Sequence, residues 1–537
     1  MTSQTCGGCQ LPDDAARSLS EFEKDVLKFQ QGTLDPETFK GRRTLFGICD
    51  QRQDGVFMLR VRVAGGVLPT GHARAIAALA SESGVSHLHL TSRQDVQLHG
   101  LSLDSIPHLL RRLLAAGLTT MGAGGNAVRN VAACPLAGVC SCESFDVTPF
   151  ALRLTEYLIA RKGSYGLPRK FKTAFSGCPA DCSMAALTDL GFVAASRDGQ
   201  ACFRVYGGGG MGNQSRIGDC LMDFLPARQV LQAGEAMRRI FEQHGDRTNR
   251  ARARLRFVAQ KMGTEAFRDL FLRHLREVAD AGQVPLLNGD TVAIESTATE
   301  FPSFQKMAGT IGIPQKDRDL AAIPIFPPLG NLRPAELERL AAFADSFSAE
   351  KTLRLTAGQQ ICIRSVAPQE MDRLVKEVSR LNPDFLAPTP LHSWTVCTGA
   401  SICRPGICDS REAARQCARA LQTSGLPEDV LNGVQVRVSG CPNSCGHHPV
   451  GEIGLCGLSR RVDEKKVFAY RISLGGRIGA DRARFGVETA TVPVQQLPSA
   501  LIRIFRHYSE QRKIGESFSD FASRRDHAEM EKILSEE

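Results

Sequence analysis

The alternation of apolar and polar residues is clearest between Val56 and Val63, where it has the period of two that is typical of a half-buried strand. Apolar residues recur with a helical period at 72–83 and, far along the chain, at 334–347. Each predicted helix is followed by an extended segment that carries Leu-x-Leu-Thr, at 88–91 and 353–356. The pattern predicts an α+β protein in which one strand–helix–strand arrangement occurs twice.

Three other segments differ from this pattern. Residues 224–281 are charged and predicted to be largely helical, residues 323–328 are rich in proline, and residues 503–537 are expected to form a charged surface helix and tail. No segment approaches 18 uninterrupted apolar residues, so we expect no membrane span. The N-terminus has neither a basic flank nor an apolar core, so we expect no secretory leader.

Cysteines repeat in the two halves of the chain with the same spacing. The second half contains a C-x5-C pair followed by a C-x3-C pair: Cys397, Cys403, Cys441 and Cys445. The first half contains both pairs 263 positions earlier: Cys134, Cys140, Cys178 and Cys182. Four thiolates are the usual ligands of a cubane iron–sulfur cluster. Buried cysteines also pack well in cores, but packing alone does not require this spacing twice.

The repeat extends to the residues around the cysteines. Phe175-Ser-Gly-Cys-Pro179 matches Val438-Ser-Gly-Cys-Pro442, and the Leu-x-Leu-Thr segments also correspond. Internal self-similarity at a fixed separation indicates a duplicated structural unit. The chain is therefore most simply interpreted as an ancient duplication with two homologous halves.

Composition and charge narrow the function classes. With 537 residues, 42% hydrophobic and 23% charged, more than one globular domain is expected. Eighteen cysteines in clustered pairs, without a leader, favour reduced, metal-bound thiols in a cytoplasm. The net charge of +9 either attracts an acidic protein donor or small anions, or is an ordinary solvated surface. Nucleic-acid binding is disfavoured, because only 6% of residues are aromatic and no basic run is interleaved with them.

The second cysteine quartet carries a specific resemblance. Ser439-Gly-Cys-Pro-Asn-Ser-Cys-Gly446, preceded by the C-x5-C pair, is similar to the cluster motif of the sirohaem-dependent sulfite and nitrite reductases. Further motifs match this family in its order: Thr91-Ser-Arg-Gln94, His99-Gly100, Arg129-Asn-Val131 and Leu167-Pro-Arg-Lys-Phe-Lys172. The resemblance implies a [4Fe–4S] cluster on Cys397, Cys403, Cys441 and Cys445. It also implies that Cys445 is shared with the sirohaem iron.

The resemblance covers most of the chain, and it divides each half into a ferredoxin-like half-domain and a nitrite/sulfite reductase 4Fe-4S domain. The expected segments are an N-terminal extension (1–44), half-domain 1 (45–118), 4Fe-4S-type domain 1 (119–222), a helical connector (223–317), half-domain 2 (318–386), 4Fe-4S domain 2 (387–505) and a charged C-terminal tail (506–537). The expected fold is thus α+β with a pseudo-twofold duplication.

Four cations of the first half are expected to form the substrate side: Arg93, Arg129, Lys170 and Lys172. The two lysines are two apart on a predicted strand and project from one face, while the arginines come from separate loops. Cations neutralise and orient an oxyanion, and lysines can supply protons. The alternative is that they are ordinary surface cations. The aligned second-half residues have lost this character: Gly358, His392, Gly433 and Gln435.

Lys172 bears on the choice of substrate. By resemblance, sulfite reducers carry Lys at this position, whereas nitrite reducers typically carry Asn. Deprotonated sulfite has two negative charges and nitrite has one, so a second lysine favours sulfite. Enzymes of this family often reduce both.

Two further sets of residues are candidate cofactor ligands. The first-half quartet offers a second [4Fe–4S] site, the alternative being unmetallated thiols. The glycine runs at 207–212 and 475–479 do not match a nucleotide-binding loop. Their backbone N–H groups are instead candidates to bind sirohaem carboxylates, with tight turns as the alternative. The residues concerned are Gly208, Gly209, Gly210, Gly475, Gly476 and the nearby Arg60, Arg62 and Arg216.

The resemblance implies six-electron reduction of sulfite to sulfide, or of nitrite to ammonia, at a sirohaem coupled to a [4Fe–4S] cluster. No flavin or NADPH module is recognised, so electrons are expected from a ferredoxin-like protein or a separate reductase subunit. Two alternatives remain open. One is a precorrin-type oxygenase of cobalamin synthesis, and the other is a non-catalytic electron-transfer subunit of a dissimilatory-type sulfite reductase.

Overall fold

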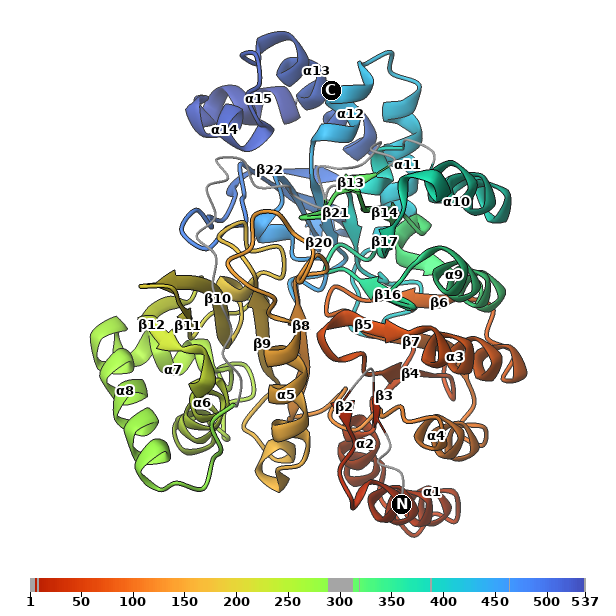
Figure 1. Ribbon diagram of the computed structural model, residues 1–537. Helices are drawn as coiled ribbons and strands as arrows, with labels where there is room; N and C mark the ends of the chain where they lie inside the picture. The colour runs from red at the N-terminus through yellow and green to blue at the C-terminus, as the bar shows by residue number, and fades with distance from the viewer. Residues whose placement is uncertain are drawn as a thin grey trace.

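The structure is a computed structural model that describes residues 5–6, 9–287, 312–317, 319–386, 389–462 and 464–535. The predicted N-terminal extension, helical connector, half-domain 2, 4Fe-4S domain 2 and C-terminal tail each include some residues outside these ranges. In the described part, two ferredoxin-like sheets share one core, and two larger sheet domains flank them (Figure 1).

The first ferredoxin-like sheet has the order β15-β6-β7-β4-β3. Its own strands are β3 (Ile48–Asp50), β4 (Phe57–Val61), β6 (Leu88–Leu90) and β7 (Val96–Leu101), and its helices are α3 (Thr70–Glu82) and α4 (Ile106–Ala115). The strand predicted at 56–63 ends earlier, at Val61. It ends there because the backbone N–H of Arg62 bonds the carbonyl of Thr119 instead of a neighbouring strand.

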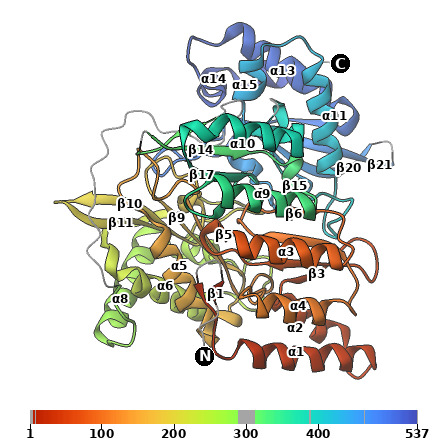
Figure 2. The ribbon, with the colours of Figure 1, turned by 45° about the vertical axis from the view of Figure 1, so that its right-hand side comes forward.

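The second ferredoxin-like sheet, β13-β14-β17-β16-β5, has the equivalent order. Its elements are β13 (Ile313–Pro314), β14 (Ala321–Ile325), α9 (Pro334–Phe347), β16 (Thr352–Leu355), β17 (Ile361–Val366) and α10 (Pro368–Leu381). The two sheets exchange edge strands: β5 (Val67–Pro69) pairs with β16, and β15 (Asn331–Leu332) pairs with β6. Helices α3 and α9 lie side by side over the shared core (Figure 2).

The two flanking sheets have the same topology. In each, three successive strands are parallel and the last two join by antiparallel pairing. The first contains β8 (Val128–Ala133), β9 (Phe171–Ser176), β10 (Leu190–Arg197), β11 (Gln200–Gly207) and β12 (Asp219–Pro226). The second contains β18 (Thr395–Val396), β19 (Val436–Ser439), β20 (Ile453–Val462), β21 (Lys465–Leu474) and β22 (Val487–Pro493). The predicted α+β fold with duplicated halves is therefore confirmed.

Helices cover both flanking sheets. The first packs with α5 (Thr148–Ile159), α6 (Val230–His244), α7 (Leu255–Met262) and α8 (Thr264–Asp280), so the predicted connector helices share its core. The second packs with α11 (Ser410–Gln422), α12 (Glu428–Gly433) and α13 (Leu497–Gln511). Near the N-terminus are the short strands β1 (Thr5–Cys6) and β2 (Cys9–Gln10) and the helices α1 (Ala15–Gln30) and α2 (Pro36–Leu45).

The charged C-terminal segment differs from the surface tail expected from its sequence. It forms α14 (Phe518–Arg524) and α15 (His527–Ser535). Phe518, Phe521 and Leu534 are buried in the core of the second flanking domain, so three spaced apolar residues outweigh the surrounding charge. Among the described residues, no helix combines the length and apolar character that a membrane crossing requires.

Candidate functional site

The second-half cysteines lie on two loops at the carboxyl ends of parallel strands. Cys397 follows β18, and its N–H donates to the carbonyl of Val438 on β19 at 3.1 Å. Its sulfur accepts hydrogen bonds from the N–H of Gly440 at 3.1 Å and is 3.2 Å from the hydroxyl of Ser410. An N–H donor to a cysteine sulfur favours its thiolate form.

The four thiols are close enough to influence one another. Burial raises the pKa of Cys397 to about 11 and that of Cys403 to about 12, and repulsion from the neighbouring Cys445 adds to both. Burial also raises the pKa of Cys441. Four thiolates therefore repel one another unless positive charge compensates them, and cluster irons provide that charge.

This donor set fits a cubane cluster. No three His, Cys, Asp or Glu side chains in the described ranges are placed to hold a single metal ion. A cubane makes a different demand, because it distributes its four cysteines over four separate irons. Cys445 is the exposed member of the quartet, so its sulfur is also accessible to a second group. The first half braces its loop, because the hydroxyl of Ser92 donates to the carbonyl of Cys445 at 3.0 Å.

Arg93 lies on the turn between β6 and β7 and points toward the first flanking sheet. Its guanidinium donates to the carbonyls of Asn130 and Thr173, the latter at 2.8 Å. Its Nε is buried without a hydrogen-bond partner in the described structure. Burial lowers its pKa to about 10. Arg93 thus joins the turn to β8 and β9 and retains one unused donor.

Arg129 lies within β8, whereas the sequence suggested a loop. Its guanidinium donates to the carbonyls of Ala123 at 2.6 Å and Gly125 at 2.9 Å, in the segment before that strand. Burial, followed by repulsion from Arg60, lowers its pKa to about 9. Its Nε is also a buried donor with no partner among the described residues.

Lys170 and Lys172 lie just before and within β9. Burial lowers the pKa of Lys170 to about 7, and repulsion from Arg254 contributes next. Burial, followed by repulsion from Lys170 and Arg93, lowers the pKa of Lys172 well below its ordinary range. Neither ammonium group has a hydrogen bond or ion pair with any residue in the described part of the chain.

The four predicted cations lie close together, next to the exposed cysteine. Arg93 is an electrostatic neighbour of Lys172, and Arg129 is one of Lys170. The charge of Cys445 partly offsets the lowered pKa of Lys170. A small anion in this position would meet two uncompensated ammonium groups and two arginine Nε donors.

Two further charged residues belong to this site and were missed from the sequence. Asp189 and Arg254 form a buried ion pair at 2.9 Å, with side-chain exposures of 0% and 6%. Asp189 also accepts the backbone N–H of Lys172 at 2.9 Å. The pair therefore holds the start of β9 in place and adds positive charge beside the lysines. Asp189 and Arg254 are 65 positions apart, so no local sequence signal indicates the contact.

His447 also belongs to this site. It is buried directly after the cysteine loop, with a positive φ of 59°. Burial, followed by repulsion from Lys172, lowers its pKa well below the ordinary value. It therefore lies among the cations as a neutral ring.

The predicted sirohaem-carboxylate residues make contacts within the protein. Arg60 donates to the carbonyl of Ala123 at 2.7 Å, and Arg62, which is 1% exposed, donates to those of Met121 and Val128. Arg216 pairs with Asp219 at 2.7 Å. The first two arginines therefore shape the loop before β8.

The two glycine runs pack closely against neighbouring segments. The N–H groups of Gly208, Gly210 and Gly475 donate to protein carbonyls. A Cβ at Gly209 would lie 2.7 Å from the carbonyl oxygen of Thr188, and one at Gly476 would lie 2.4 Å from that of Gly451. Close backbone approach therefore accounts for Gly209 and Gly476.

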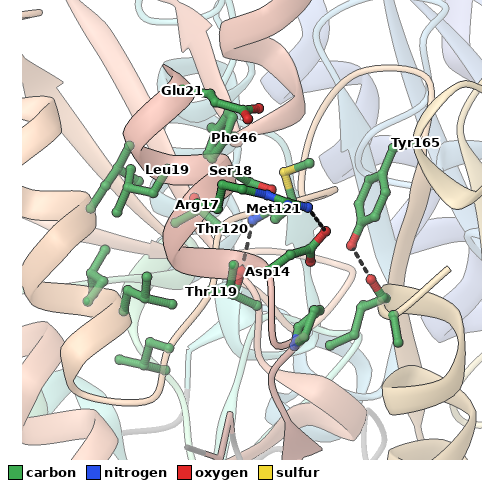
Figure 3. Close-up of a pocket in the computed structure, with 18 of the residues that line it drawn as sticks. Asp14, Arg17, Ser18, Leu19, Glu21, Phe46, Thr119, Thr120, Met121 and Tyr165 are labelled. Carbon is green, nitrogen blue, oxygen red and sulfur yellow. Dashed lines mark hydrogen bonds and ion pairs between the residues drawn. The ribbon is translucent and has the colours of Figure 1, made fainter. Parts of the chain in front are cut away.

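A cavity of about 420 Å³ lies elsewhere, between α1, the loop after α4 and a short 3-10 turn at Lys162–Tyr165 (Figure 3). Asp14 and Arg17 form an ion pair of 3.6 Å at its edge, and the hydroxyl of Tyr165 donates to the carbonyl of Ile159. None of the residues predicted above as site residues lines this cavity.

Comparisons with known proteins agree with this architecture. The family model described as the nitrite and sulphite reductase 4Fe-4S domain matches residues 124–278. The model described as the nitrite/sulfite reductase ferredoxin-like half domain matches residues 50–116 and 313–381. The two half-domain matches fall on the two sheets that share a core.

Named relatives match along most of the chain. The ferredoxin–nitrite reductase of Synechococcus elongatus is 32% identical over 460 residues, which cover 83% of this chain and 85% of that protein. The ferredoxin sulfite reductase 1 of Mycolicibacterium paratuberculosis is 25% identical over 525 residues, which cover 93% and 90%. The solved structure of the Mycobacterium tuberculosis NirA protein has the same fold, with a TM-score of 0.81 over 96% of this chain and 97% of that one, at 23% identity.

Duplicated sheets with paired cysteine loops, one beside a half-buried group of cations, define an iron–sulfur oxidoreductase. The chain belongs to the nitrite and sulfite reductase family.

Proposed function

We propose that the protein reduces sulfite to sulfide with six electrons, at a sirohaem coupled to a [4Fe–4S] cluster on Cys397, Cys403, Cys441 and Cys445. The observation that carries the proposal is the pair of amine groups on Lys170 and Lys172, which have no hydrogen-bond or ion-pair partner in the described structure, with Lys170 an electrostatic neighbour of the exposed Cys445. Burying two such cations is costly, and an anion between them offsets that cost.

When bound, the sirohaem and the cluster supply the redox chemistry. The chain itself binds, orients and protonates the substrate. Arg93 and Arg129 are fixed by hydrogen bonds to backbone carbonyls, and each keeps a buried Nε donor that has no partner in the described structure. Lys170, whose pKa is about 7, holds a transferable proton at Nζ near neutral pH. Each substrate oxygen leaves as water and needs such protons.

The Asp189–Arg254 pair positions the start of β9 and does not itself react with the substrate. Asp189 holds the backbone N–H of Lys172 and therefore fixes the start of β9. Arg254 keeps that carboxylate from neutralising the lysine ammonium groups, because it engages both carboxylate oxygens. The anion therefore meets a net positive site.

Sulfite is the preferred substrate in this proposal because Lys172 adds a second amine, and a dianion stabilises its protonated form, which burial disfavours, more strongly than a monoanion does. Nitrite is the second candidate, reduced to ammonia. It is supported by the similarity to proteins named ferredoxin–nitrite reductase. A ferredoxin-like protein is the proposed electron donor, in accord with the names of these relatives and with the net charge of +9, which attracts an acidic partner.

The test is anaerobic turnover with reduced methyl viologen, in which sulfide and ammonia are measured for the wild type and for Lys172→Asn. We expect both activities in the wild type, and we expect Lys172→Asn to lower kcat/KM for sulfite about tenfold more than for nitrite, equivalent to roughly 1.4 kcal/mol. Lys24→Asn, an exposed lysine on α1, is the matched control. An unchanged ratio would remove the basis for preferring sulfite, and a purified protein that lacks sirohaem absorption would refute the reaction.

A further inference from the structure

The first-half cysteine loops have the same backbone hydrogen bonds as the second-half loops. The N–H of Cys134 donates to the carbonyl of Phe175 at 3.0 Å, as that of Cys397 does to Val438 at 3.1 Å. Three further bonds from a backbone N–H to a backbone carbonyl occur in both halves, 263 positions apart. In the first half the donor and acceptor residues are Cys140 and Leu136, Ser144 and Gly177, and Asp181 and Cys178. In the second half they are Cys403 and Gly399, Ile407 and Gly440, and Ser444 and Cys441.

The two C-x3-C loops also have the same unusual backbone conformation. Asp181 and Met184 have φ values of 52° and 58°, and their counterparts Ser444 and His447 have 57° and 59°. Non-glycine residues adopt this region rarely, and they persist there only where the surroundings impose it. The Asp181 carboxylate holds the first loop, because it accepts from the hydroxyl of Ser176 and the N–H groups of Ala185 and Ala186.

All four first-half thiols meet inside this frame. Those of Cys140 and Cys178 hydrogen-bond to each other, and those of Cys134 and Cys182 form a second such pair. Three of the four cysteines are buried and Cys182 is half-buried. The four sulfurs are therefore mutual neighbours in a largely buried space, and four sulfur donors are the ligands of a cubane iron–sulfur cluster.

The other half of the molecule braces each C-x5-C loop in the same way. The N–H of Lys316 donates to the carbonyl of Val139 at 2.9 Å, as that of Arg52 does to Ile402 at 2.8 Å. On the first-half loop, the Arg364 guanidinium also donates to the carbonyls of Pro135 and Ala137. Lys316 and Arg364 are themselves held by ion pairs, with Glu143 and Glu350 respectively, so these contacts fix the position of the loop.

The surroundings beyond the sulfurs differ between the halves. His447 is an electrostatic neighbour of Lys172, whereas its counterpart Met184 packs in an apolar cluster that includes Leu187 and Ala357. Arg93 is matched by Gly358, and the lysine positions are matched by Gly433 and Gln435. An anionic macrocycle and an oxyanion both need cations. The surroundings of the first-half cysteines therefore suit neither.

We propose that Cys134, Cys140, Cys178 and Cys182 hold a second [4Fe–4S] cluster that carries no tetrapyrrole. The proposal is independent of which oxyanion is reduced, because it concerns only the sulfur ligands of the first half.

Iron and acid-labile sulfide per chain test the proposal directly, on full-length protein reconstituted anaerobically with iron and sulfide. Two clusters and one sirohaem give about nine irons and about eight sulfides, whereas one cluster gives about five and four. About nine irons with sirohaem present supports the proposal. About five irons after reconstitution overturns it, although sirohaem absorption would leave the proposed reaction intact.

Variants locate the extra irons. Cys134→Ala/Cys178→Ala is expected to lose about four irons and to retain the sirohaem absorption. Cys142→Ala is the matched control, because Cys142 is buried beside the quartet but its counterpart is Pro405. Nine irons in the double variant would overturn the assignment. Should that variant fail to fold, electron paramagnetic resonance of reduced wild type decides, because a haem-free cubane adds about one spin per chain and its absence overturns the proposal.

Discussion

Lys170 makes the site sensitive to pH in the neutral range. Burial and the nearby Arg254 are the main causes of its pKa of about 7, Arg129 and Arg169 add to the effect, and the charge of Cys445 opposes it. A lysine with a lowered pKa is protonated below that value and neutral above it. The cation that attracts the substrate anion is therefore present in acid and lost as the pH rises through about 7.

The size of the effect follows from this pKa. One pH unit below it about nine-tenths of Lys170 is charged, and one unit above it about one-tenth is charged. If the charged form is required for binding, kcat/KM should fall about tenfold between pH 6 and pH 8, because this parameter reports the pKa values of the free enzyme. Nitrite is the suitable substrate, since it stays a monoanion over this range whereas sulfite changes its own charge.

The assay is anaerobic nitrite turnover with reduced methyl viologen across this range. We expect Lys170→Gln to lower kcat/KM at pH 6 and to remove the descending limb, and we expect Lys170→Arg to move that limb to higher pH, because arginine stays protonated. Lys162→Gln, an exposed lysine, should leave the profile unchanged. A descending limb that persists unaltered in Lys170→Gln would refute this account.

Two other substitutions test the sulfur bridge and the buried ion pair. Cys445→Ser should abolish reduction of both oxyanions, because the exposed thiolate is the proposed link between cluster and sirohaem; retained turnover would contradict that role. Asp189→Asn should lower the free energy of urea unfolding by about 3–5 kcal/mol, since it leaves Arg254 buried without its partner. The exposed pair of Arg204 and Asp481 is the comparison, because Asp481→Asn should cost less than about 1 kcal/mol, and equal losses would argue against a structural role for the buried pair.

The sequence predicted the features that depend on a short local pattern, such as single helices, or on the internal repeat. The helix predicted at 334–347 has those bounds in the structure, and the repeated register indicated two equivalent halves. The exchange of β5 and β15 was not predictable, because strands of three and two residues carry no periodic pattern. Each of these strands pairs with a strand of the other half, so the pairing depends on how the two halves pack together.

The same distinction applies to the site. Lys170 and Lys172 could be proposed as site residues from the sequence, because they lie on one short segment of a recognisable motif. Asp189 was not, because its importance arises from two contacts made through folding: the ion pair with Arg254 and the backbone N–H of Lys172. The second half has the same backbone contact, in which Gln435 donates to Glu452 at 2.9 Å. Both halves therefore hold this backbone N–H with a carboxylate, whether the residue that carries the N–H is Lys172 or Gln435.

The duplicated loops separate what the backbone determines from what the side chains determine. Hydrogen bonds such as Cys134 to Phe175 and Cys397 to Val438 place the sulfur ligands equally well in both halves. Reactivity toward an anion requires cations. Cations are grouped near Cys445, whereas the corresponding place in the first half has apolar contacts around Met184. In the two proposals above, one backbone thus holds an iron–sulfur cluster twice, while the charged side chains beside one copy determine where the oxyanion binds.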